Sequence, residues 1–595
     1  LERASSSHPR LHISKPESQN PRAPLHPLRQ RPPPVTMNHG DPGHRCRCSH
    51  GPRCAGAPPQ EGLAAAALDS RVRPLPMGAE AESMLRQIGA YTPNLDAHTV
   101  TLLSCVHSVL PPPPVASNHA ALSALLPPPQ DGGDDRISGL PDKLLRDIVS
   151  RLPVKDGART AALSCRWRGV WRSVPLVLVD SDLLPVQTGS GLQVAHADAQ
   201  RVASAVTRIL DAHPGPFRSV HLICSFLDKC PDLLARWLQL LAVKGVQELV
   251  LVNRPWPLNM RIPPTFFAMA TLTRLYLGVF EFPDTRILPR AASFPHLREL
   301  GLCCVQILRR EDMDFILARS PVLEILCIQV NMLMKHLLLV SRSLRCVQVI
   351  ESIDLSIAVK DAPHLERLII WAATVRDGLP RRVNIGHAPA LSLVGYLDPE
   401  RHSLEIGNTV IKAGTTASPS TMVPSVKILG VRVCFGVRNV AKMLPSFLRC
   451  FPNVERLHLE SNETYEPTGK LNNQFWQEVG AIECVQSHMK LMVFYGFRGE
   501  RGELSFLKFV LESALVLTKL VIVFTKGSFT SMAEASSKVK PLFAAKWASK
   551  DCSLVLLESV FQAGEDKWLL NFKAGSDFST GDPFTRTAAL RGCNF

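Results

Sequence analysis

A spaced pattern of apolar residues recurs along the middle of the chain and limits what the chain can fold into. The spacing L-x-x-L-x-L first occurs at Val246, Leu249 and Leu251, in the stretch "VQELVL". Five further copies follow, and the steps between their first positions are 26, 25, 26, 21 and 21 residues. The last two apolar positions of each copy are two residues apart, as on one face of a β-strand. One short strand per unit at near-constant intervals predicts a solenoid of stacked repeats.

The unit length and the apolar pattern are those of leucine-rich repeats. A weaker copy is expected at Leu391, and clearer ones at Val426 and Val454. The asparagine that often follows the strand in regular repeats is missing, so we expect irregular curvature. The six well-spaced copies begin at Val246, Leu272, Leu297, Leu323, Leu344 and Leu365.

The part of the chain before the repeats has a different composition. Of the 48 prolines in 595 residues, 22 precede position 130, and residues 1–135 are predicted to be a disordered proline-rich tail. A weakly amphipathic segment at 84–110 allows one short helix within it. The first methionine is Met37, which leaves open that residues 1–36 lie upstream of the start.

A cluster of metal-binding residue types lies in this tail, at His44, Cys46, Cys48, His50 and Cys54. A structural zinc site needs four ligands in a closed cage, and Cys-x-Cys spacing without a second pair or apolar support is poor for one. Neither a phosphate-binding loop nor a catalytic motif occurs in the sequence. We therefore predict no metal, no cofactor and no catalytic residue.

Charge and cysteine content limit which classes of partner and which cellular compartment fit this chain. The net charge of +15 is spread thinly, without a run of five basic residues, and does not predict a nucleic-acid site. The 16 cysteines form no disulfide framework, and several lie in apolar runs, as reduced core cysteines do. No run of 18 apolar residues occurs, so no membrane partner is expected. A cytoplasmic or nuclear location is predicted.

Three short helices are predicted within residues 136–175. Pro141 suits a first helical position and Asp142 suits the positive helix start. Pro153 ends this helix, and Asp156 and Ser164 are candidate N-caps of the next two. Three short helices in about 40 residues make a unit that is marginally stable alone. The apolar face of the first helix consists of Leu144, Leu145, Ile148, Val149 and Leu152.

The stretch "ALSCRWRGVWRSVP" at 162–175 interleaves tryptophans with arginines. A single-strand nucleic-acid platform would need exposed aromatic rings beside the cations. At about 100° per residue, Trp167 and Trp171 share one helical face with Val170 and Val174. The arginines lie outside this face, which favours buried rings with solvated charges, so Arg166, Arg168 and Arg172 are at most steering charges.

The stretch "DRISGLPDKLLRDIVSRLPVKDGARTAALSCRWRGVWRSVP", residues 135–175, resembles an F-box of the large plant group that joins this motif to irregular leucine-rich repeats. Gly157-Ala158 departs from the bulkier apolar residues common there, and Cys165 from a basic residue. The fold class expected is therefore α/β: a disordered tail, a three-helix F-box at 136–180 and an irregular leucine-rich-repeat solenoid at 181–450.

The stretch "CVQSHMKLMVFYGFRGERGELSFLKFVLESALVLTKLVIVF", residues 484–524, resembles the FBD domain that often closes such chains. It predicts a strand from Lys490, a turn at 496–499, a helix from Glu503 to Ala514 and a second strand. The segment "FRGERGE" within it is expected to be a charged surface turn. An FBD-like domain is placed at 451–530, and the C-terminal end of the solenoid at 531–595.

The F-box resemblance implies docking to a Skp-type adaptor and, through it, to a cullin ubiquitin ligase. The repeats would then hold an unknown substrate protein, and the chain itself would supply no nucleophile. A repeat scaffold without ligase output and a nucleic-acid binder using the basic tail remain as alternatives. For Leu163, Val170 and Trp171, packing within the helices is as plausible as adaptor contact. The implied adaptor-binding residues are Leu140, Pro141, Leu144, Leu145, Ile148, Leu152, Pro153, Leu163, Val170 and Trp171.

Overall fold

The computed structural model assigns most of the chain to one compact unit. The Cys/His cluster of the tail and residues 84–94 of the expected helix lie outside the part that it describes. The described residues are 11–13, 95–115, 135–184, 194–227, 231–254, 260–289, 291–463, 469, 471, 473–562 and 571–585.

Three helices follow the tail as predicted. The Ser164 hydroxyl caps the third helix by accepting a hydrogen bond from the backbone N–H of Trp167. Pro153, and not Asp156 as predicted, is the N-cap of the second. Asp156 lies one turn further on, where its charge still favours the helix start. The helices are α3 (Asp142–Ser150), α4 (Val154–Thr160) and α5 (Cys165–Ser173).

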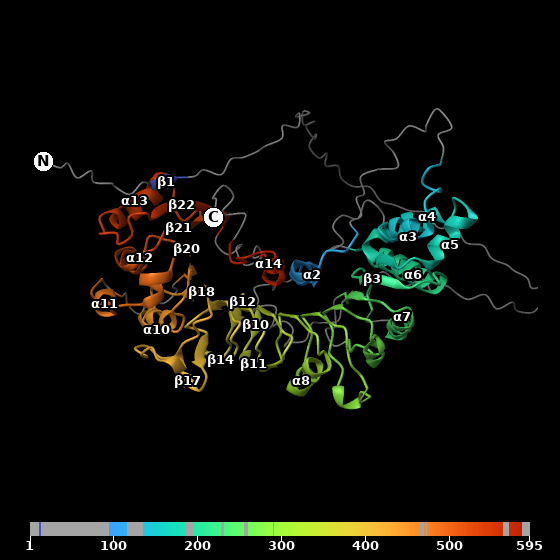
Figure 1. Ribbon diagram of the computed structural model, residues 1–595, viewed down its shortest axis with the longest axis horizontal. Helices are drawn as coiled ribbons and strands as arrows, with labels where there is room; N and C mark the ends of the chain where they lie inside the picture. The colour runs from blue at the N-terminus through green and yellow to red at the C-terminus, as the bar shows by residue number, and fades with distance from the viewer. Residues whose placement is uncertain are drawn as a thin grey trace, which may run out of the picture. The chain divides into compact units, whose positions relative to one another are not determined.

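A parallel sheet of 15 strands forms the solenoid, and from β2 to β22 its strands follow one another in chain order (Figure 1). Every predicted copy of the apolar pattern contains one strand, whereas β2 and β3 precede the first copy and were not predicted. The strands are β2 (Leu176–Val179), β3 (Phe217–Leu222), β4 (Glu248–Val252), β5 (Arg274–Gly278), β6 (Glu299–Cys303), β7 (Ile325–Gln329), β9 (Cys346–Ile350), β12 (Arg367–Ile370), β15 (Leu393–Leu397), β18 (Ile428–Val433), β19 (Arg456–Ser461), β20 (Leu491–Tyr495), β21 (Lys519–Lys526), β22 (Ser553–Gln562) and β1 (Leu11–Ile13).

The prediction of disorder for residues 11–13 is wrong, since these residues form β1. Leu11 lies opposite Leu554 and Ile13 opposite Leu556, so β1 adds a parallel strand beyond β22. Backbone hydrogen bonds to an unpaired strand edge need no particular sequence, which is why composition alone did not indicate this strand.

The strand register stacks the repeating apolar residues into continuous ladders. Leu249 lies opposite Leu275, which lies opposite Leu300 and then Leu326. All four are at most 1% exposed and belong to one hydrophobic core. The side chains that alternate with them point to the other side of the sheet. We call that side the second face; its residues include Tyr276, Gly301, Cys327, Gln348 and Ile369.

The change in repeat length coincides with a change in the connecting element. The steps of 25 and 26 residues between β4 and β7 contain helical turns, whereas the two 21-residue steps contain strands. A strand advances about 3.3 Å per residue and a helix about 1.5 Å, so a strand crosses the same repeat with fewer residues. The helical elements up to β7 are α6 (His196–Ala212), α7 (Pro231–Val243), α8 (Arg310–Arg319), η1 (Asp180–Leu183), η2 (Pro264–Ala268) and η3 (Thr285–Ile287).

The connecting strands pair with one another in two smaller sheets. One has the order β17-β16-β14-β11-β8, and the other consists of β10 and β13. Their bounds are β8 (His336–Val340), β10 (Ser352–Ile353), β11 (Ser356–Asp361), β13 (Ala373–Thr374), β14 (Arg381–His387), β16 (His402–Ile406) and β17 (Thr409–Val410). Beyond them the connections are again helical: η4 (Pro419–Thr421), α9 (Arg438–Ala441), α10 (Leu444–Arg449), α11 (Asn473–Glu478), η5 (Cys484–His488), α12 (Arg501–Ser513) and α13 (Met532–Phe543).

The elements predicted at 484–524 are β20, α12 and β21, joined by a turn with positive φ at Gly496 (71°) and Gly499 (73°). The description of "FRGERGE" as a surface turn is wrong for Phe497, Gly502 and Glu503, which are buried. Glu503 is fully buried, and its carboxylate accepts hydrogen bonds from the Ser461 hydroxyl (2.6 Å) and from the backbone N–H of Arg498 (3.0 Å). Glu503 therefore joins the turn to the end of β19.

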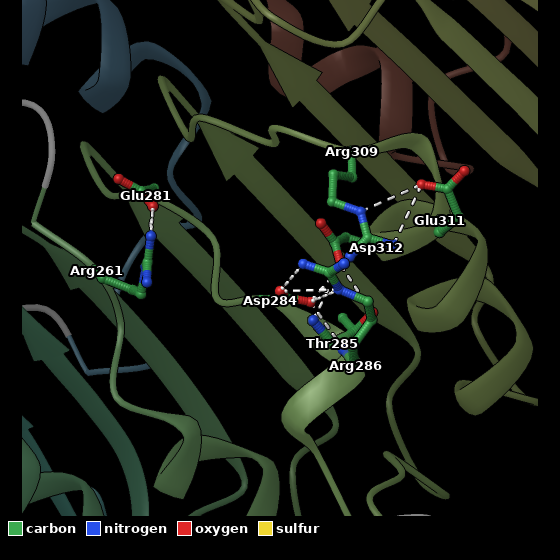
Figure 2. Close-up of polar contacts among 8 residues, drawn as sticks. All are labelled: Arg261, Glu281, Asp284, Thr285, Arg286, Arg309, Glu311 and Asp312. Atoms are coloured by element: carbon green, nitrogen blue, oxygen red, sulfur yellow. Dashed lines mark hydrogen bonds and ion pairs between the residues drawn. The ribbon is translucent and has the colours of Figure 1, made fainter.

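Polar contacts fix the helical connections of the longer repeats to one another (Figure 2). Asp312, at the start of α8, is 3% exposed and accepts hydrogen bonds from the backbone N–H (3.0 Å) and hydroxyl (2.7 Å) of Thr285. Asp284 pairs with Arg286 and, at 3.0 Å, with Arg309. Its hydrogen bonds to Arg286 hold the pKa of the Asp284 carboxyl well below its usual range. Asp312 and Asp284 thus join η3 to the next repeat.

Replacing Asp312 by alanine is expected to destabilise the repeats by about 1–3 kcal/mol, because two donors of Thr285 lose a buried acceptor. Asp314→Ala, on the same helix, removes a carboxylate that is 37% exposed and should change stability by less than about 0.5 kcal/mol. Urea unfolding of the full chain, followed by circular dichroism, measures both. Equal losses for the two variants would contradict this role of Asp312.

Candidate functional site

Helix α3 carries apolar side chains on two faces. Leu145 and Val149 are buried in the core of the three helices, at 0% and 1% exposure. Leu144 and Ile148, four residues apart and therefore neighbours on the helix surface, are 49% and 39% exposed. Leu163, just before α5, is 67% exposed. A short helix with apolar residues outside its own core is typical of a protein-docking surface.

The residues predicted to bind an adaptor fall into three groups. Pro141, Leu144, Ile148 and Leu163 are exposed, and we call these four the exposed apolar group. Leu145 and Val170 are 0% and 2% exposed and pack in the core, so adaptor contact by these two does not fit the structure. The half-buried residues are Leu140, Leu152, Pro153 and Trp171.

Arg166 fixes the chain at the start of α3 and is not a free steering charge. Its guanidinium donates hydrogen bonds to the Asp142 carboxylate (2.9 and 2.7 Å) and to the backbone carbonyl of Leu140 (2.6 Å). The indole N–H of Trp167 donates to the hydroxyl of Ser138 (2.7 Å). Both contacts fix the chain before α3 against α5. Arg168 and Arg172 remain exposed, as expected.

The unusual glycine at 157 is explained by its contact with Trp171. A Cβ atom at Gly157 would lie 2.9 Å from Cζ3 of the indole, closer than such atoms approach. On its other side the Trp171 ring lies 5.0 Å, between centroids, from the ring of His213, which follows α6. Gly157 therefore makes room for the side chain through which the three helices contact the start of the solenoid.

Gly157→Val is expected to displace Trp171 and to destabilise the three helices by about 1–3 kcal/mol, the usual cost of overpacking. Gly169→Val is the matched control, because no atom lies within 4 Å of a Cβ at this helical glycine. Hydrogen exchange of residues 142–173, read by mass spectrometry, should accelerate in the first variant only. Unchanged exchange in Gly157→Val would show that Trp171 does not depend on the glycine.

The second face of the sheet, where a repeat protein commonly holds a ligand, is occupied by two segments of the chain itself. One is helix α2 (Leu95–Val109), in which Leu102, Cys105 and Val106 are at most 1% exposed. The Gln329 side-chain amide on β7 donates to the backbone carbonyl of Cys105 (2.8 Å). The helix allowed at 84–110 is therefore present from Leu95 and packs on the solenoid.

The other segment is 571–585, with helix α14 (Phe572–Ser576), which lies beside α2 (Figure 1). Residues 531–595 were placed at the end of the solenoid, where α13 and β22 are found. Residues 571–585 instead return to strands in its middle: Arg367, on β12, donates to the carbonyl of Gly575 (3.0 Å). Charged and aromatic residues at strand positions that alternate with leucines, as in "VERLHL", were the only sign of this arrangement in the sequence.

Groups suited to metal binding or to nucleophilic attack are scarce among the described residues. Within these ranges no three His, Cys, Asp or Glu side chains are grouped so that they could hold a metal ion. Burial raises the pKa values of the Cys303, Cys304 and Cys327 thiols well above the ordinary value, which makes them poor nucleophiles. Among the helices described, none combines the length and the apolar character needed to cross a bilayer.

Three protein-family models match separate parts of the chain. The F-box domain matches residues 137–178, and the FBD matches residues 477–522. Between them, the model of the repeats of "FBD-associated F-box protein At5g56370" matches residues 234–459. The F-box match contains α3–α5, the FBD match contains β20 and α12, and the repeat match contains the strands of the long sheet from β4 into β19.

The names of similar proteins from Arabidopsis thaliana refer to two or three of these parts. The chain is 25% identical to F-box/LRR-repeat protein 13 over 434 residues, which cover 65% of this chain and 89% of that protein. It is also 25% identical to FBD-associated F-box protein At5g60610 over 412 residues, or 64% of this chain and 98% of that protein. F-box/FBD/LRR-repeat protein At1g13570 is 29% identical over 192 residues, or 32% of this chain and 43% of that protein.

Proposed function

Because the chain belongs to the F-box proteins that carry leucine-rich repeats and an FBD, we propose that it is the substrate-recognition subunit of a Skp–cullin–F-box ubiquitin ligase. The F-box and the repeats support a substrate-recognition role in such complexes in general. The finer proposal is that the exposed apolar group docks the adaptor and that the repeats hold the protein to be ubiquitinated.

The exposure of Leu144 and Ile148 beside a closed core is the observation that carries this proposal. The buried face of α3 already supplies the packing that the three helices need, through Leu145 and Val149. The exposed apolar group therefore serves a partner. Fully burying one such side chain is worth about 1.5–3 kcal/mol, so two or three of them support a specific complex. An apolar adaptor groove that accepts a short helix fits this face.

The reaction would be accelerated by positioning alone. The chain would hold a substrate lysine close to a ubiquitin-charged conjugating enzyme, which raises their effective concentration. Such a role needs no nucleophile from this chain. A cytoplasmic or nuclear location belongs to the same proposal, and the described cysteines, all free thiols, fit a reducing compartment.

The double variant Leu144→Ala/Ile148→Ala is expected to lower affinity for a purified Skp-type adaptor by at least tenfold, because two apolar anchors are shortened. Val243→Ala, 84% exposed on α7, is the control for loss of a surface apolar residue and should bind normally. Isothermal titration calorimetry measures both, and circular dichroism verifies the fold. Undiminished binding by a folded double variant would place the adaptor on another surface.

Ligase output separates the proposal from the alternative of a scaffold without ligase output. Proteins captured by the full chain should turn over more slowly in cells that express Leu144→Ala/Ile148→Ala in place of the unmodified chain. A pulse-chase measurement of a captured protein reads this directly. Capture of the same protein with identical lifetimes in both lines would favour the scaffold.

A further inference from the structure

The segment 571–585 is bound to the second face as a peptide ligand would be. Arg367 contributes four hydrogen bonds, to the backbone carbonyls of Ala574 (3.4 Å), Gly575 (3.0 Å), Asp577 (3.0 Å) and Thr580 (2.8 Å). These four hydrogen bonds fix the course of the segment through its backbone, and the same guanidinium lies 4.7 Å from the centroid of the Phe578 ring. Any chain that forms the same turn could present these carbonyls.

The second face also binds an acidic side chain of this segment. Asp582 is buried, and its carboxylate lies 2.9 Å from Nε2 of His458 and 3.5 Å from the guanidinium of Arg456, both on β19. Burial alone would raise the pKa of Asp582, but His458 and Arg456 outweigh it and hold the pKa below its ordinary value. The carboxylate is therefore charged at neutral pH and bound by its charge.

Three aromatic rings of the second face contact Phe584, which lies two residues further along the segment. The Phe584 ring lies 4.9 Å from that of Tyr396, and 5.6 Å from those of Trp371 and His458, between centroids. Phe584 is 1% exposed, and Trp371 and Tyr396 are 0% exposed. Edge and tilted contacts of this kind are favourable beyond the area that they bury.

The composition of this face differs from that of a core. The core face of β12 and β19 carries Leu368, Ile370, Leu457 and Leu459, whereas the second face of the same strands carries Arg367, Arg456 and His458. Purely structural capping of a sheet needs only apolar residues, since buried charge is costly. Cations and aromatic rings in alternation are the chemistry that recognises an acidic residue beside an aromatic one.

We propose that the second face from β12 to β19 is a peptide-binding site occupied in the free protein by residues 571–585, and that the partner presents a segment with aspartate two residues before an aromatic residue. This inference rests on the proposed function in one respect only: the partner would be the substrate to be ubiquitinated. The site itself and its specificity follow from the contacts of Asp582 and Phe584.

Because the chain's own segment occupies the site, a partner must bind tightly enough to displace it. A tethered segment acts at an effective concentration of about 1 mM. A partner at about 1 μM must therefore bind the face about a thousandfold more tightly than the chain's own segment to displace it. Peptides that bind the second face weakly would therefore fail to displace the segment.

The test uses the full chain and a fluorescent synthetic peptide of residues 571–585, with binding read by fluorescence anisotropy. The full chain carrying Asp582→Asn/Phe584→Ala holds its own segment less well, so it should bind the peptide at least tenfold more tightly than the unmodified chain. Equal binding by the two chains, or no binding by either, would overturn the proposal. Adding His458→Ala to the variant chain should abolish the gain.

Peptide variants test what the face reads. A peptide with Asp582→Asn should bind at least tenfold more weakly, because a neutral amide replaces the carboxylate that lies against His458 and Arg456. Asp577→Asn makes the same change of charge at an exposed carboxylate and keeps the backbone carbonyl to which Arg367 donates, so it should bind like the unaltered peptide. Equal losses for the two peptides would mean that the face responds to net charge and does not recognise Asp582.

Two measurements keep the test valid if the variant chain does not fold. In the unmodified chain, about 1 mM peptide should accelerate hydrogen exchange of residues 571–585, and unchanged exchange would overturn displacement. Adaptor binding separates the proposals: Leu144→Ala/Ile148→Ala should leave peptide binding intact, and Asp582→Asn/Phe584→Ala should leave adaptor binding intact. Failure of one proposal is then recognisable without failure of the other.

Discussion

The structure depends on the burial of one ladder of apolar side chains that crosses the strands of the long sheet from β2 to β22. Each repeat supplies residues such as Leu275 and Leu300, which no single repeat can bury. Stacking removes them from water only if adjacent strands keep the same register, since a slip of one residue would exchange the two faces. The ladder therefore fixes which side chains reach the second face. The contacts of Arg367 and His458 exist because Leu368 and Leu457 are held on the core side.

The same constraint explains how the chain varies its repeats without losing the sheet. Connections of different length are accommodated because only the strand must keep its place. Where the step falls to 21 residues, β8 and β11 replace a helix and pair with each other, so their backbone polar groups remain satisfied. In the longer repeats, the side chains of Asp312 and Asp284 form the polar contacts that hold the connecting segments together. Variation of the outer layer thus leaves the second face continuous.

The FBD resemblance predicted β20, α12 and β21, and local periodicity was enough to predict the strands of the long sheet from β4 to β19 and the three helices of the F-box. Neither could predict β1 or the return of residues 571–585, because both depend on contacts between segments hundreds of residues apart. Of the ten predicted docking residues, four are exposed and two are buried, and phasing alone could not tell Leu144 from Leu145 as the exposed neighbour. The departure at Gly157 from the bulkier apolar residues common in the motif is explained only by the Trp171 ring, which fills the space of its missing side chain.

The joint between the F-box and the repeats determines what docking could achieve. Only two residues separate α5, which ends at Ser173, from β2, which starts at Leu176 as the first strand of the sheet. Val170 and Val174 belong to the same hydrophobic core as Phe217 and Val220 of β3, and Trp171 contacts His213. A continuous core resists bending, since any rotation would open voids between packed side chains. An adaptor bound to Leu144 and Ile148 would therefore fix the direction of the repeats as well as their position. A target lysine would then be restricted to few orientations relative to the conjugating enzyme, which is the condition under which positioning alone accelerates a reaction.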